Sequence, residues 1–156
     1  MAATIAKHPI HPMLVVFPIG LWIFSLVCDL VFLFGSANPL WRDMAFYTMA
    51  GGWIGALAAA VPGLIDYFSM TPGAAKRVAT THMALNLVAV TLYAINLWIR
   101  WSGNGAGGWP VGLSVLAVLL LAAAGWLGGE LVYVHGMGVE EKPQAPRPQR
   151  DRRRVA

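Results

Sequence analysis

Four long apolar segments determine what this chain can fold into. They cover residues 12–35, 44–68, 78–101 and 110–135. A helix rises about 1.5 Å per residue, so about 20 consecutive apolar residues span the hydrocarbon core of a bilayer. Hydrophobic residues make up 58% of the chain and charged residues only 12%, whereas soluble domains carry about 25% charged residues. The sequence therefore predicts an all-α, four-helix transmembrane bundle that occupies residues 1–138 as one domain.

The basic residues predict the orientation of this bundle. With four spans, the two termini and the loop between the second and third helices share one side of the membrane. That side holds nine of the 11 Lys and Arg residues: Lys7, Lys76, Arg77, Lys142, Arg147, Arg150, Arg152, Arg153 and Arg154. Because positive charge is retained in the cytoplasm, both termini are expected to be cytoplasmic.

The last segment, residues 139–156, is rich in proline and charge and has no hydrophobic period. It cannot bury enough apolar surface to offset its ordering entropy, and we expect a disordered basic cytoplasmic tail. The sequence pI of about 9.6 then reflects membrane topology, and no nucleic-acid partner is expected.

Titratable side chains from all four predicted helices fall at the cytoplasmic face. His8 and His11 precede the first helix, His82 lies in the third and His135 closes the fourth. Asp66 comes from the end of the second helix, and Glu130 lies about 7 Å deeper than His135 at 1.5 Å per residue. Ionisable groups within a membrane are functional candidates by default, so this face is the candidate site.

Two prolines shape the lead-in to the first helix, "HPIHP". Each proline disfavours the helical region for the histidine before it. We therefore expect a stiff, non-helical segment that folds over the mouth of the bundle as a lid carrying His8 and His11. The alternative is a rigid helix start with two solvated histidines.

Three models of the site follow from these residues. A b-type haem would take paired histidines as axial ligands, with His82 and His135 as the best pair, His11 in reserve, and Lys76 and Arg77 beside the propionates. A transition-metal ion could instead take the imidazoles with Asp66 or Glu130, although no His-x-x-x-His pair is present. In the third model the side chains form a polar network that fixes packing or relays protons; its members are Asp66, His82, Asn86, Glu130 and His135.

Two prolines and one carboxylate within the first two predicted helices carry further expectations. Pro18 and Pro62 are expected to kink the first and second helices. Asp29, at the opposite end of the first helix, needs a cationic partner, and Arg42 and Arg100 are the candidates on that side.

Four motifs, "HPIHPMLVVFPIGLW", "PGLIDYF", "THMALN" and "GGELVYVHG", resemble the domain-of-unknown-function family 2231 of predicted bacterial membrane proteins. The resemblance covers residues 8–138. It implies a four-helix integral membrane protein of the bacterial inner membrane. Some members look fused to Rieske iron–sulfur domains, which implies a redox function. For this chain, the resemblance then implies that the redox partner is a separate protein. The resemblance supplies no established activity and no site residues.

The expected function is redox-linked cofactor binding and electron transfer, with b-type haem favoured and a metal ion as the alternative. The chain is not expected to be an enzyme on its own. The competing class is a non-enzymatic membrane scaffold or accessory subunit. The lipid bilayer is the expected environment, and the oligomeric state is left open.

Overall fold

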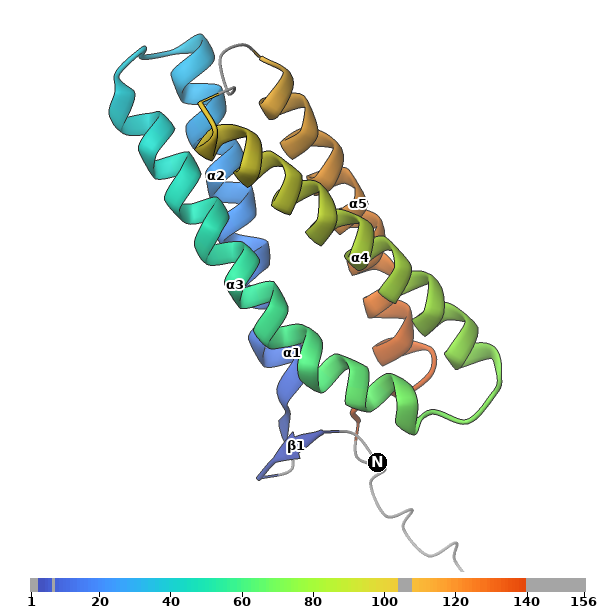
Figure 1. Cartoon of the computed structure of the whole chain (residues 1–156). Helices are drawn as coiled ribbons and strands as arrows, with labels where there is room; N and C mark the ends of the chain where they lie inside the picture. The colour runs from blue at the N-terminus through green and yellow to red at the C-terminus, as the bar shows by residue number, and fades with distance from the viewer. Residues whose placement is uncertain (1–2, 7, 104–107, 140–156) are drawn as a thin grey trace, which may run out of the picture.

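The computed structural model describes residues 3–6, 8–103 and 108–139, which form an elongated helical bundle (Figure 1). Two short strands, β1 (Thr4–Ile5) and β2 (His8–Pro9), pair antiparallel ahead of the helices. The helices are α1 (Ile10–Leu14), α2 (Val16–Phe34), α3 (Pro39–Ser69), α4 (Ala74–Trp101) and α5 (Trp109–Tyr133). The predicted tail lies outside the described residues apart from Val139.

In the described part of the chain, four helical segments are long and apolar enough to cross a membrane: Ile10–Phe34, Pro39–Ser69, Ala74–Trp101 and Trp109–Tyr133. The prediction of a four-helix fold is therefore confirmed. Two of the helices begin four or five residues earlier than their apolar runs. The extra turns carry Arg42 and Asp43 in α3 and Lys76 and Arg77 in α4, because a helix continues into the polar interface where hydropathy no longer marks it.

Local sequence sets several of the helix ends. At the start of α3, Asn38 accepts a hydrogen bond from Leu40 N at 3.0 Å and Pro39 occupies the first turn, where its missing N–H costs nothing. The first span is interrupted at Val15, three residues before Pro18, which cannot donate to the Leu14 carbonyl. Pro62, in contrast, lies within the uninterrupted α3.

One expectation for the N-terminal segment is wrong. His11 lies inside α1, which begins at Ile10, so "HPIHP" is not wholly non-helical. Pro12 falls in the first turn of α1, where a missing N–H breaks no intrahelical bond. The first turn of α1 therefore accommodates Pro12, although a residue that precedes a proline, here His11, generally disfavours the helical conformation.

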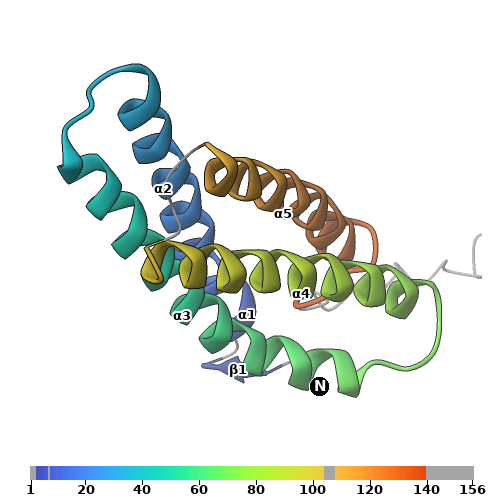
Figure 2. The ribbon, with the colours of Figure 1, turned by 45° about the horizontal axis from the view of Figure 1, so that its top comes forward.

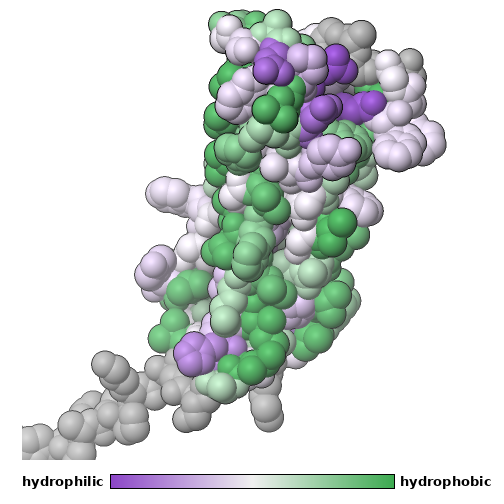
Figure 3. Space-filling view, turned by 90° about the vertical axis from the view of Figure 1, so that its left-hand side faces the viewer, coloured by the Kyte–Doolittle hydropathy of each residue, from purple (hydrophilic) through white to green (hydrophobic). Residues whose placement is uncertain are grey.

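The helices form two hairpins, α2–α3 and α4–α5, which lie side by side (Figures 1 and 2). Their shared core contains five buried side chains: Trp22, Met49, Tyr93, Ala117 and Leu121. Large apolar side chains such as Ile54 and Leu119 are exposed around the bundle. Figure 3 shows a mainly apolar flank with polar residues gathered toward its ends, as a bilayer-spanning surface requires.

Candidate functional site

The structure brings His11 and His82 together between the two hairpins. His11 comes from α1 and His82 from the third turn of α4. Their ring centroids are 6.3 Å apart and the ring planes are nearly perpendicular, at 85°. Both side chains are half-buried. The two imidazoles are therefore close enough to share one ligand.

A backbone carbonyl of a neighbouring long helix fixes each of these imidazoles. His11 Nδ1 donates to the Ala59 carbonyl of α3 at 2.8 Å, and His82 Nδ1 donates to the Ala124 carbonyl of α5 at the same distance. Because a carbonyl only accepts, both Nδ1 atoms carry the proton. In the neutral rings, both Nε2 atoms are then left as acceptors or metal ligands.

Glycines make room for both rings. A Cβ atom at Gly63 would lie 2.8 Å from His11 Nδ1, and one at Gly128 would lie 3.3 Å from His82 Cε1. Each glycine follows the accepting carbonyl by one helical turn. A larger residue at Gly63 would displace the imidazole that the Ala59 carbonyl holds.

The two Nε2 atoms differ in their surroundings. His82 Nε2 lies 3.2 Å from Asn86 Nδ2, which also donates to the His82 carbonyl at 2.8 Å. Within the described part of the chain, His11 Nε2 has no hydrogen-bond partner. One ring nitrogen is thus partly satisfied by its own helix and the other is free.

The remaining sequence candidates lie nearer the end of the bundle. His8 is exposed and donates from Nδ1 to the Ala6 carbonyl at 2.8 Å, while Asp66 accepts from the Ala3 backbone N–H. His135 Nε2 lies 3.9 Å from Glu130 Oε1. Glu130 sits in the last turn of α5 with 36% of its side chain exposed.

The two basic residues expected beside a haem differ in exposure. Lys76 Nζ donates to the Met70 carbonyl at 3.0 Å and lies 4.8 Å from the centre of the Tyr67 ring. Arg77 is exposed. Both lie in the first turn of α4, about two turns before His82. They therefore lie at the end of the bundle and not beside the imidazole pair.

A second polar cluster lies at the opposite end of the bundle. Asp29 accepts from Arg100 Nη1 and Nη2 at 2.8 and 2.7 Å, which confirms the expected cationic partner. Arg100 Nε donates to Asn96 Oδ1 at 2.9 Å, and the Asn96 amide donates to Pro110 O and Ser114 Oγ. Sequence reasoning missed Asn96, although its spacing of four from Arg100 on one helix face was a usable signal.

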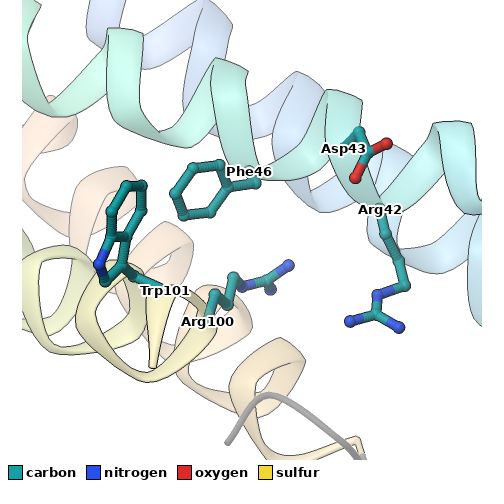
Figure 4. Close-up of a pocket in the computed structure, with 5 residues that line it drawn as sticks. All are labelled: Arg42, Asp43, Phe46, Arg100 and Trp101. Atoms are coloured by element: carbon teal, nitrogen blue, oxygen red, sulfur yellow. The ribbon is translucent and has the colours of Figure 1, made fainter. Parts of the chain in front are cut away.

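An open pocket of about 250 Å³ lies beside this second cluster (Figure 4). Its lining combines α3 and α4 side chains: Arg42, Asp43, Phe46, Arg100 and Trp101. Phe46 and Trp101 stack with centroids 6.3 Å apart. The Arg100 side chain is occupied by Asp29 and Asn96, so the pocket is the outer edge of a structural ion pair.

Among the described residues, no group of three or more His, Cys, Asp or Glu side chains is arranged to hold a metal ion. The bare-ion model therefore lacks a complete protein ligand set in this part of the chain. The His11–His82 pair brings two metal-ligating side chains from different hairpins close together.

Comparison with known proteins gives one result. No curated protein and no solved structure is significantly similar to the chain. A family model described as "Predicted membrane protein (DUF2231)" matches residues 7–141, which include all four membrane-capable helices. The chain therefore belongs to this domain-of-unknown-function family of predicted membrane proteins.

Proposed function

We propose that the protein binds a redox-active metal cofactor, best a b-type haem, between His11 and His82 and transfers electrons at that face of the membrane. One observation carries the proposal: two imidazoles from different hairpins lie with their ring centroids 6.3 Å apart, and both donate their Nδ1 protons to backbone carbonyls. Metal-ligating histidines almost always donate their second ring N–H to a carbonyl or carboxylate. In the neutral rings this leaves Nε2 as the nitrogen that could bind a metal.

The ring separation agrees with a single metal between the two histidines. An imidazole nitrogen binds a metal at about 2.0–2.1 Å and its ring centroid lies about 1 Å further back. Two ligands on opposite sides of one ion would therefore have centroids about 6 Å apart, and the observed distance is 6.3 Å. His82 would have to give up the contact of its Nε2 with Asn86.

Haem is favoured over a bare ion because only two protein ligands converge. A haem supplies four equatorial nitrogens and leaves at most two positions for protein ligands, whereas a structural or catalytic ion site needs three or four protein ligands. His135, Lys76 and Arg77 would then serve the edge of the site, where cationic donors pair with propionates. In this arrangement His11 and His82 would be the two ligands, and His135 would lie beside the haem without ligating it.

The site is proposed to face the cytoplasm of the bacterial inner membrane, with a separate redox protein as the electron partner. The excess of Lys and Arg at this end supports that orientation. Reporter fusions after Val139 and after Gly105 should report opposite compartments, with the former cytoplasmic. The reverse assignment would move the site to the other face.

The experiment is an oxidised and reduced visible spectrum of the detergent-purified protein, expressed with haem supplied. We expect a reduced-state haem band that His11→Ala and His82→Ala each abolish and that His135→Ala retains. Elemental analysis of the same samples distinguishes haem iron from a bound zinc or copper ion. A colourless, metal-free protein would refute the proposal.

A second candidate function has its own observation. His82 already uses both ring nitrogens, through Ala124 and Asn86, as a structural or proton-relaying network would. The protein would then be a membrane scaffold or accessory subunit. In that case Asn86→Val should destabilise the bundle, and His11→Ala should change no spectrum because no cofactor is bound.

A further inference from the structure

Three contacts between the first and third membrane-capable helices join residues at one constant sequence offset. The ring centroids of His11 and His82 lie 6.3 Å apart with their planes at 85°, and Asp29 pairs with Arg100; each pair is 71 positions apart. Between them, the Trp22 and Tyr93 rings stack with centroids 4.2 Å apart and planes 14° apart, again across 71 positions. Three contacts spread along the whole bundle therefore share one register.

Contacts within each hairpin repeat as well. In the first half of the chain, α1 and α2 donate to α3: His11 donates to Ala59 O at 2.8 Å and Ser25 donates to Ala45 O at 2.7 Å. In the second half, α4 donates to α5: His82 donates to Ala124 O and Asn96 donates to Pro110 O, both at 2.8 Å. The donors are again 71 positions apart and the acceptors 65. Gly63 and Gly128, which flank the two imidazoles, are also separated by 65.

The sequences of the donating helices agree in the same register. "HPMLVVFPIGLWIFSLVCD" and "HMALNLVAVTLYAINLWIR" share the leading histidine, three leucines and an aromatic residue when aligned without gaps. The leucines are Leu14, Leu21 and Leu26 against Leu85, Leu92 and Leu97. The geometric register and the sequence register therefore coincide.

Only one kind of symmetry makes a residue touch its own equivalent. In an isologous, two-fold arrangement, residue i contacts residue j and j contacts i, so self-contacts occur only at the axis. Since α2 and α4 run in the same direction along the bundle (Figure 1), the axis lies along the bundle. Parallel repeats of this kind occur in membrane transporters, with the axis along the membrane normal.

We infer that residues 8–69 and 79–133 are two copies of one helical hairpin, and that the His11–His82 site lies on the pseudo-two-fold axis between them. Each copy supplies an equivalent half-site: one imidazole, one backbone carbonyl that fixes it, and one glycine beside the ring. The site therefore suits a ligand with two like faces, such as a metal tetrapyrrole. The ligand class rests on the proposed function, whereas the repeat itself does not.

Divergence between the copies has a physical consequence at the other end of the axis. Asp29 and Arg100 occupy equivalent positions with opposite charges, buried to 3% and 12% exposure. Two copies of either hairpin alone would place like charges in contact at low dielectric. The pair thus favours association of unlike hairpins, while the ligand end keeps a histidine and a neighbouring glycine in both copies.

The first test exchanges residues across the axis in the full-length protein. Asp29→Arg and Arg100→Asp should each lower the thermal unfolding midpoint in detergent by about 10 °C, or prevent accumulation of monodisperse protein. The double exchange should recover at least half of that loss. Recovery is not expected to be complete, because Asn96 accepts a hydrogen bond from Arg100 and the equivalent position beside Asp29 holds Ser25. Trp22→Tyr combined with Tyr93→Trp should likewise be more stable than the worse of its single variants. Exchanges no better than the worse single variants would overturn the repeat.

The second test compares the half-sites. With hemin as the probe, His11→Ala and His82→Ala should lower the bound haem per chain to the same extent, within about twofold. Loss of binding in only one variant would overturn the equivalence of the half-sites. If wild-type protein binds no haem, the proposed function fails, while the exchange variants still decide the repeat.

Discussion

Removal of the Asp29 charge is expected to be the most damaging conservative change in this protein. Asp29→Asn keeps the side-chain shape but replaces one of the two oxygens that accept from Arg100, at 2.8 and 2.7 Å, with an amide donor. Breaking a buried ion pair from one side costs about 3–5 kcal/mol, because the other charge stays buried without compensation. Arg100 keeps its bond to Asn96 and is 12% exposed, so we expect the lower end of this range, about 3 kcal/mol.

The assay is equilibrium unfolding of purified protein in mixed micelles with increasing denaturing detergent, followed by helical circular dichroism. Arg42→Gln is the matched control, because Arg42 is an exposed arginine near the same end whose guanidinium carbon lies 5.6 Å from the centre of the Phe32 ring. It should change the free energy of unfolding by less than about 0.5 kcal/mol. An Asp29→Asn cost below about 1 kcal/mol would show that the ion pair is not desolvated.

Three further substitutions test the packing around the axis. Gly63→Ala should cost about 1–3 kcal/mol of stability and reduce cofactor binding, because its Cβ would lie 2.8 Å from the imidazole Nδ1 atom; Gly20→Ala, with nothing within 4 Å, should be neutral or slightly stabilising in the same unfolding assay. Tyr93→Phe should leave stability unchanged or raise it by about 1 kcal/mol, since this buried hydroxyl has no partner among the described residues, and a loss of that size would indicate a hidden one. Asn86→Val should raise haem affinity about two- to tenfold in a hemin titration by freeing His82 Nε2, and weaker binding would show that Asn86 supports the site.

The fold was predictable because hydropathy reports directly on membrane spans. The four helices follow from apolar runs alone, and the charged first turns of α3 and α4 were missed because hydropathy falls at the interface while the backbone continues. The Asp29 partner was also predictable, since an unpaired carboxylate in a span needs a cation and only two were available on that side.

The pairing of the histidines was not predictable from the properties the sequence analysis used. His135 matched His82 in approximate depth in the membrane, but depth does not determine which neighbouring helix a side chain points toward. His11 was assigned to a non-helical lid from its following proline, and the first turn of α1 tolerates that proline. The repeat register does align His11 with His82, so a search for internal repeats would have favoured this pair.

The electron paramagnetic resonance spectrum of the ferric, hemin-loaded protein tests the central claim most directly. Hydrogen bonds to Ala59 and Ala124 hold the His11 and His82 rings at 85°, and perpendicular axial imidazoles give a strongly anisotropic low-spin signal. We predict that signal in the wild-type protein and its conversion to high-spin in both His11→Ala and His82→Ala. A high-spin wild-type spectrum, or a low-spin signal that survives either substitution, would contradict haem ligation by this pair.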